Sequence, residues 1–432
     1  MNERRIPEQK TLPLGKNLFW GVSGNVVFAA TQWLVLIALA RLGSPEDVGM
    51  LTIVTALITP IFVFGDLAMN DAHTVDDLSE FRRADYFALR LVGALCAASA
   101  SVVVSFMWFG AEAALVGAAL AFIVVKFIGS QMQLNHGIFQ REQRVDLLAR
   151  SNVTRGIIGC LVFALVFGAT GELWVALLGQ ALVWAFVLGR LDRSFLGQVG
   201  VSDRFTSVLS TNRRTLGRLL LWLLPLALTA LLVNATISVP RLALGATADL
   251  AAVGVFGAIA FIDTGFGVAI NAIGFASASR LRAAIRQGKR RKFVALSLVL
   301  MALTTAIGGT LFLVGYLFGE EILTVLYGAE YVDMAVFVVI IASTALRSVF
   351  APLQVALTAG HVLWRRFFIN VAAFTATFAA ALLLVPEQGA FGAAVAFMVG
   401  IITRCVLLVV FFVRLVWTMQ TAGGADHQLS GS

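Results

Sequence analysis

Apolar residues occur along this chain in long runs, with short polar turns between them. A membrane-spanning helix needs about 20 apolar residues, whereas the strands of a membrane barrel alternate apolar and polar side chains. The pattern therefore predicts an all-α integral membrane protein with twelve transmembrane helices. The predicted spans are 17–42, 46–70, 86–109, 112–139, 150–170, 172–190, 216–244, 249–276, 293–318, 331–359, 366–385 and 389–415.

The composition supports this class. The 432 residues are 59% hydrophobic and only 13% charged, whereas an ordinary soluble domain is about 25% charged. A water-soluble enzyme and a disordered chain are both excluded, because so few charges do not cover the surface of a soluble protein of this size. The three cysteines have neither metal-ligand nor disulfide spacing.

The charged residues differ between the two sides of the predicted membrane. The odd-numbered connections are short and acidic, and the even-numbered ones are longer and basic, notably 191–215 and 280–292. All but five of the 32 lysines and arginines are assigned to the termini and the even-numbered connections. Because basic residues concentrate on the cytoplasmic side of membrane proteins, we expect both termini to be cytoplasmic. The basic N-terminus then forms a retained arm and not a signal peptide.

The sequence also shows an internal duplication. Arg41 at the end of the first span corresponds to Arg241 at the end of the seventh, and each is followed by an aspartate that opens the next span. The pairs Lys126–Gln133 and Arg347–Gln354 have the same spacing in spans four and ten. These matches predict two six-helix lobes related by a pseudo-two-fold axis along the membrane normal. The predicted parts are an N-terminal lobe (1–190), a cytoplasmic linker (191–215), a C-terminal lobe (216–418) and a flexible polar tail (419–432).

Five basic residues lie within the predicted spans or at their edges. An ionisable group near the centre of a membrane helix costs at least about 2.5–3.5 kcal/mol, so such groups face a bundle interior, a partner or a water-filled path. One interpretation is a cationic cavity that binds phosphate or pyrophosphate. The alternative is that acidic residues pair with two of the cations and that those at the outer span ends reach the membrane interface. The five residues are Arg41, Lys126, Arg241, Arg347 and Arg404.

Polar residues inside the spans extend this candidate site. The amides favour a hydrophilic passage, although each by itself is also typical of a contact between helices. The candidate amides are Asn25, Gln32, Gln133, Asn234, Asn271 and Gln354. Asp66, Asp263 and His136 are candidates for binding a coupling H⁺ or Na⁺, and the alternative for each is a static ion pair or a hydrogen-bonded helix contact.

Features of an enzyme are missing from the sequence. There is no glycine-rich phosphate loop ending in GK[ST], no cluster with metal-ligand spacing, and no outer loop long enough to form a catalytic domain. We therefore expect neither catalytic residues nor a resident metal or cofactor. The basic net charge of +8 is attributed to orientation in the bilayer, and no nucleic-acid partner is expected.

The first 75 residues resemble a known family. The segment from Gly24 to Asp76 is similar to the opening of a Wzx-type polysaccharide flippase of the multidrug/oligosaccharidyl-lipid/polysaccharide (MOP) exporter superfamily. The pieces that carry the resemblance are the Asn25 region, Gln32–Trp33, Ala40–Arg41–Leu42, Pro45–Gly49, Pro60 and Phe64–Gly65–Asp66. Within the proposed cationic cavity the motif match is direct at Arg41, and the other four cations are assigned by their depth in the spans.

The resemblance implies a transporter of the bacterial inner membrane. Its cargo would be an undecaprenyl-diphosphate-linked oligosaccharide, moved from the cytoplasmic to the periplasmic leaflet by alternating access, and its partners would be the bilayer and other polysaccharide-assembly membrane proteins. A MATE-like multidrug or cation antiporter is the alternative, although two acidic residues against five basic ones argue against a cationic cargo. A membrane enzyme acting on prenyl-phosphate sugars is a third class.

Overall fold

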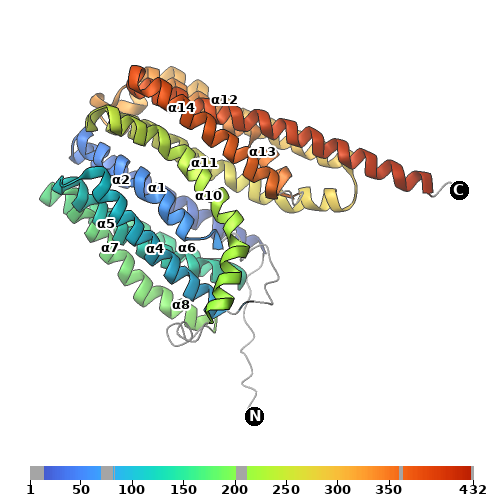
Figure 1. Cartoon of the computed structure of the whole chain (residues 1–432), viewed down its shortest axis with the longest axis horizontal. Coiled ribbons are helices and arrows are strands. Elements are labelled where there is room, and N and C mark those ends of the chain that lie inside the picture. Colours follow the sequence, from blue (N-terminus) through green and yellow to red (C-terminus); the bar gives the residue numbers. More distant parts are fainter. Residues whose placement is uncertain (1–13, 70–80, 82, 201–211, 360–362, 430–432) are drawn as a thin grey trace, which may run out of the picture. The chain divides into compact units, whose positions relative to one another are not determined.

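The computed structural model describes residues 14–69, 81, 83–200, 212–359 and 363–429. These residues form helices joined by short turns (Figure 1), as the apolar pattern predicts. The chain divides into two compact units, Met1–Asn234 and Ala235–Ser432. The division falls inside one long helix. The segment 201–211, within the predicted linker 191–215, lies outside the described residues.

Unit 1 contains the helices of the N-terminal part. They are α1 (Leu14–Leu42), α2 (Pro45–Gly65), α4 (Arg83–Phe109), α5 (Ala113–Arg141), α6 (Val145–Thr170), α7 (Leu173–Phe186), α8 (Arg193–Gln198) and the first part of α10 (Arg213–Thr247). Local sequence explains several helix ends. Ser44 and Asp47 form a capping box at the start of α2, in which the Ser44 N–H donates to Asp47 Oδ2 at 2.9 Å. Gly171 ends α6 with a left-handed φ of 68°.

A π-helical turn, Val187–Asp192, joins α7 to α8. Asp192 is fully buried there and its Oδ2 accepts a hydrogen bond from Asn135 Nδ2 on α5 at 3.1 Å. Beyond the turn, Phe195 packs edge-on against Phe139, with ring centroids 6.3 Å apart. The turn and α8 are therefore anchored to α5 by one polar contact and one apolar cluster.

Small residues allow close helix packing in unit 1. A methyl group added at Gly93 on α4 would overlap the main-chain oxygen of Gly65 on α2, and one at Gly24 on α1 would lie 2.6 Å from Ala149 on α6. Glycine lets helix backbones approach where any side chain would keep them apart. These positions fix how α2 meets α4 and how α1 meets α6.

Unit 2 contains the rest of α10 and four further helices. They are α11 (Leu250–Arg286), α12 (Arg290–Leu326), α13 (Met334–Ala359) and α14 (Leu363–Leu429), with a short 3₁₀ turn at Ala329–Tyr331. The last helix extends into the segment 419–432, which was expected to be a polar tail.

The helix α14 consists of two antiparallel arms. Its apolar part, Phe367–Thr418, has 52 residues, which at about 1.5 Å per residue is more than twice the thickness of a bilayer core. The backbone breaks at Gly389, where φ is 56° and ψ is −130°. A methyl group at Gly392 would contact the Leu384 carbonyl oxygen, which is impossible in one straight helix. The two predicted spans 366–385 and 389–415 therefore correspond to the two arms.

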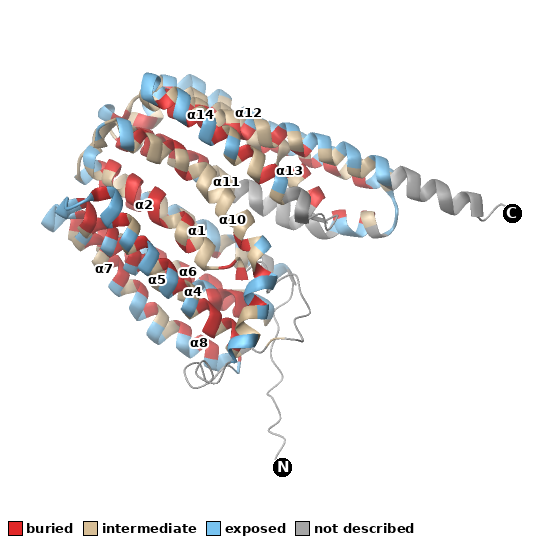
Figure 2. Ribbon diagram, viewed as in Figure 1, coloured by how far each residue is buried: buried red, intermediate tan, exposed pale blue. Residues whose placement is uncertain are grey.

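Eleven helices among the described residues are long and apolar enough to cross a membrane, and twelve crossings result when the arms of α14 are counted separately. Exposed residues, pale blue in Figure 2, occur along these helices. Many of them are large and apolar, including Met107 at 81%, Leu182 at 73% and Leu383 at 72% exposure. Apolar surface of this extent is unfavourable in water and favourable in lipid. The structure is that of a multi-pass helical membrane protein.

Candidate functional site

In unit 2, a buried carboxylate is held by two residues of one neighbouring helix. Asp263 on α11 is 4% exposed. Its Oδ1 lies 2.7 Å from Arg347 Nη2 and accepts a hydrogen bond from Thr344 Oγ1 at 2.8 Å. Arg347 and Thr344 both belong to α13, three residues apart, so they lie on the same face of that helix.

Arg347 also binds the main chain of the same aspartate. Its Nη2 donates to the Asp263 carbonyl oxygen at 3.0 Å. A methyl group at Gly267, one turn further along α11, would lie 3.3 Å from that nitrogen, so the absence of a side chain there leaves room for the guanidinium. The arginine therefore fixes both the side chain and the backbone of Asp263.

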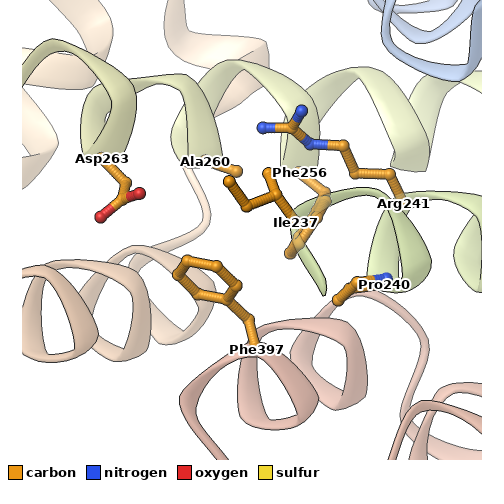
Figure 3. Close-up of a pocket in the computed structure, with 7 residues that line it drawn as sticks. All are labelled: Ile237, Pro240, Arg241, Phe256, Ala260, Asp263 and Phe397. Atoms are coloured by element: carbon orange, nitrogen blue, oxygen red, sulfur yellow. The ribbon is translucent and has the colours of Figure 1, made fainter. Parts of the chain in front are cut away.

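A small pocket lies beside this ion pair (Figure 3). Arg241 on α10 and Asp263 lie at opposite ends of it. Arg241 is half-buried, and its Nε makes no hydrogen bond to any residue that the structure describes. The pocket therefore contains an arginine and an aspartate, and the aspartate is already bound by Arg347 and Thr344. Its lining residues are Ile237, Pro240, Arg241, Phe256, Ala260, Asp263 and Phe397.

Another arginine contact in unit 2 joins α13 to α14. Arg404 Nη2 donates to Gln354 Oε1 at 3.0 Å. Gln354 follows Arg347 by two helical turns and lies on the same side of α13. The structure thus brings four predicted site residues, Asp263, Arg347, Gln354 and Arg404, to one face of α13.

A second carboxylate cluster lies in unit 1. Asp66 follows the last residue of α2, and its Oδ1 accepts a hydrogen bond from Ser130 Oγ on α5 at 2.5 Å. Arg90 Nη1 on α4 lies 3.1 Å from the same Oδ1 and donates to the Asp66 main-chain oxygen at 2.6 Å. Its Nη2 donates to Gln133 Oε1 at 3.3 Å. Arg90 is only 1% exposed.

The two units therefore share one arrangement. In each, an aspartate Oδ1 contacts both a hydroxyl group and an arginine, and the arginine also binds the main-chain oxygen of that aspartate. The arginines come from different places, α4 in unit 1 and α13 in unit 2. We call these groups the Asp66 clamp (Asp66, Arg90, Ser130) and the Asp263 clamp (Asp263, Arg347, Thr344).

Lys126 lies next to the Asp66 clamp on α5. It precedes Ser130 by four residues, so both project from one face of the helix. Its ammonium group is 5.2 Å from the ring centroid of Phe122, and no hydrogen bond or ion pair joins it to a described residue. Arg41, the remaining predicted cation, is exposed in the last turn of α1.

The other predicted polar residues make contacts inside unit 1 or within their own helix. Asn25 Oδ1 accepts from Asn152 Nδ2 at 3.1 Å, and His136 Nε2 lies 3.1 Å from Ser151 Oγ. Gln32 Nε2 is buried and makes no hydrogen bond to a described residue. Asn234 donates to the Ala230 carbonyl one turn earlier on α10. The side chain of Asn271 lies outside the described part of the chain.

Two buried arginines were not expected. Arg90 and Arg155 lie in candidate spans and are 1% and 5% exposed, so the assignment of all but five basic residues to the termini and connections is wrong for them. Both lie at least four residues past the start of a predicted span. Asn152 and Arg155, three residues apart, also share a helix face. These positions in the sequence could have identified Arg90 and Arg155 as residues inside the spans.

The comparisons with known proteins give distant relatives. No protein-family model matches the sequence. The chain is 23% identical over 327 residues to the capsular polysaccharide biosynthesis protein CapF of Staphylococcus aureus, covering 76% of this chain and 80% of CapF.

Solved structures resemble the whole chain. The lipid II flippase MurJ in its inward closed conformation has a TM-score of 0.68 at 10% identity, covering 96% of this chain and 93% of MurJ. A MOP superfamily transporter of Pyrococcus furiosus, described as having a binding pocket of reverse polarity, has a TM-score of 0.59 at 14% identity, with 94% and 96% covered. An inward-facing multidrug-resistance MATE transporter has a TM-score of 0.57 at 14% identity, with 96% and 98% covered. The chain therefore has the fold of the MOP superfamily transporters.

Proposed function

We propose that this protein flips an undecaprenyl-diphosphate-linked oligosaccharide from the cytoplasmic to the periplasmic leaflet of a bacterial inner membrane. Transport proceeds by alternating access between two six-helix lobes related by a pseudo-two-fold axis, with both termini in the cytoplasm. A cationic cavity binds the diphosphate, and no chemical reaction is catalysed. This Wzx-type assignment extends the resemblance of the first 75 residues.

The observation that carries the proposal is the balance of charge around Asp66 and Asp263. The Asp66 clamp contains one acid and one arginine, and Lys126 beside it is a further cation. The Asp263 clamp is likewise balanced, and Arg241 is the further cation across its pocket. At each clamp there is thus one basic group in excess of the clamp's aspartate. Diphosphate oxygens are well suited to arginine forks and to the point charge of a lysine.

The names of two relatives support a carbohydrate-lipid cargo. CapF is a capsular polysaccharide biosynthesis protein, and MurJ is a lipid II flippase. A MATE-like cation antiporter is the alternative, because MATE transporters have the same fold. A cationic drug needs an accessible carboxylate, and Asp66 and Asp263, the two carboxylates that the sequence places within spans, are each bound by an arginine. The charge balance therefore favours an anionic cargo.

A transport assay tests the proposal. The full-length protein is reconstituted in vesicles containing a fluorescent polyprenyl-diphosphate oligosaccharide, and the fraction protected from an external quencher is followed over time. We expect the wild type to accelerate exchange between leaflets, and Lys126→Ala and Arg241→Ala to slow it roughly tenfold each. Arg150→Ala, at an exposed position on α6, is the matched control. An unaccelerated wild type that instead extrudes a cationic dye would overturn the flippase in favour of the antiporter.

Ion coupling is a separate part of the proposal. Asp66, Asp263 and His136 are the candidate groups for H⁺ or Na⁺, and other polysaccharide-assembly membrane proteins are the proposed partners. Imposing a pH or a Na⁺ gradient across the same vesicles tests the coupling. Transport that responds to neither gradient would remove it.

A further inference from the structure

Beside each clamp lies a basic residue that is not paired with the aspartate of that clamp. Lys126 lies on the same face of α5 as Ser130 and within electrostatic range of Asp66. Arg241 lines the same pocket as Asp263. In both units a single carboxylate is therefore within reach of two cations, and in both the structure pairs it with only one of them, Arg90 or Arg347.

Each clamp arginine makes a second contact with the aspartate that it pairs with. Arg90 and Arg347 each bridge the carboxylate and the main-chain oxygen of the same aspartate. In each clamp one nitrogen makes both contacts, Nη1 of Arg90 and Nη2 of Arg347. The other nitrogens of Arg90 donate to the Ser130 main-chain oxygen and to Gln133 Oε1, and these contacts need the spread donors of a guanidinium, which Lys126 lacks. The hydroxyl groups of Ser130 and Thr344 satisfy the same Oδ1 atoms. Each aspartate is therefore held by three contacts, two at Oδ1 and one at its main-chain oxygen.

We propose that Arg90 and Arg347 are positioning residues, which occupy Asp66 and Asp263 so that Lys126 and Arg241 remain available to bind the anionic phosphates of the cargo. The inference rests on the proposed function for the identity of the cargo, and on the clamp geometry for the division of roles. It separates the basic residues into two classes. Lys126 and Arg241 contact the cargo. Arg90 and Arg347 do not contact it and act by binding the two aspartates.

The division of roles is tested first without any ligand. A double-mutant cycle of Asp66→Asn and Lys126→Met is measured by thermal unfolding of the full chain in detergent, in the wild type and in Arg90→Leu. When Arg90 is present, Asp66 and Lys126 are expected to show little coupling. In Arg90→Leu the freed carboxylate pairs with Lys126, and the coupling increases several-fold. Equal coupling in both backgrounds would overturn the inference.

Unit 2 supplies a matched cycle in case Arg90→Leu does not fold. Asp263→Asn and Arg241→Met are combined in the wild type and in Arg347→Leu. The Arg347 side chain is 30% exposed, so its removal is less damaging than that of the buried Arg90. The expected increase in coupling is the same. Because this cycle requires no cargo, its result is independent of whether the flippase proposal is correct.

The second test uses geranyl diphosphate as the probe and measures its affinity for the purified protein. Arg90→Leu is expected to weaken binding roughly tenfold, because Asp66 then neutralises Lys126. The double variant Arg90→Leu/Asp66→Asn removes both charges and is expected to recover affinity to about twofold of the wild type. Arg150→Leu is the control for a loss of positive charge elsewhere.

The outcomes separate the two proposals. A purely structural role for Arg90 predicts that the double variant binds no better than Arg90→Leu, and that result would overturn the positioning role. A wild type that does not bind geranyl diphosphate would count against the flippase proposal and against a phosphate cargo for Lys126 and Arg241. In that event the coupling cycles still decide whether the arginines keep the acids from the neighbouring cations.

Discussion

Arg155 packs against two aromatic rings of unit 1. Its guanidinium carbon is 4.0 Å from the ring centroid of Phe28 and 4.9 Å from that of Trp184. Its Nη2 donates to Asn152 Oδ1 at 2.8 Å. A flat guanidinium stacks on aromatic rings while donating in its own plane. The site therefore recognises the shape of arginine as well as its charge.

Arg155→Lys is expected to lower the free energy of unfolding by about 2 kcal/mol, because the lysine keeps the charge and loses the stacking and the bond to Asn152. Thermal unfolding of the purified protein in detergent measures the effect. Arg150→Lys, at an exposed position of the same helix, is expected to change stability by less than about 0.5 kcal/mol. Equal effects of the two substitutions would contradict this account.

At this scale the sequence predicted individual residues better than their contacts. Asp263 and Arg347 were singled out because charges are rare inside spans, and the structure joins them in one ion pair. Arg90 and Arg155 were missed because apolar periodicity locates a span without showing which of its charges face other helices. The direction in which a charged side chain faces depends on packing between segments far apart in the sequence, and no local pattern shows that packing.

Among the helices, close approach of backbones determines how α2 pairs with α4 and how α1 pairs with α6. The contact of Gly93 on α4 with Gly65 on α2 has no room for a methyl group. The added volume would push the two helices apart and displace the end of α2, where Asp66 is clamped.

Gly93→Ala is expected to destabilise the protein by about 1–3 kcal/mol, as overpacking of a tight contact does. Gly309→Ala on α12, where nothing lies within 4 Å of the added methyl group, should be neutral or stabilising by up to about 1 kcal/mol. Melting temperatures in one detergent compare the two. Loss of stability in both variants would indicate a general intolerance of alanine and not a packing effect.

The turn between the arms of α14 rests on the backbone of Gly389, whose φ of 56° and ψ of −130° suit glycine and no residue with a side chain. Gly389→Ala is therefore expected to cost about 1–3 kcal/mol, although the added methyl group would meet no other atom within 4 Å. Thermal unfolding beside the Gly309→Ala control measures the cost. An unchanged melting temperature would contradict a strained turn.

Over the whole molecule, the apolar pattern predicted the helices well. The predicted span 86–109 is α4 (Arg83–Phe109), and 331–359 is α13 (Met334–Ala359). The positions where helices extend beyond the apolar core were not predicted, since polar residues at a helix end carry no hydrophobic signal. The compact units meet within α10 at Asn234, in the middle of an apolar run, where composition shows no boundary.

Orientation in the membrane is predicted from charge and is open to a direct test. The acidic turns and the basic connections should lie on opposite sides, with the basic ones in the cytoplasm. Alkaline phosphatase fused after Thr170 is expected to be active and the same enzyme fused after Val199 inactive, because it folds only outside the cytoplasm. A fluorescent protein fused to the C-terminus should be fluorescent. The reverse pattern would contradict the cytoplasmic placement of the termini.

The π-helical turn between α7 and α8 has a consequence for the direction in which α8 presents its side chains. Each residue advances an α-helix by about 100°, and a π turn accommodates one residue more than an α turn. Deleting one residue here would therefore convert the turn to α-helix and leave Phe195 facing Phe139, whereas deleting one from a regular part of α7 would rotate α8 by about that angle. The turn thus absorbs one extra residue without changing the rotational phase of α8. It also has room for a change of residue type at Gly189, where an added methyl group meets nothing within 4 Å.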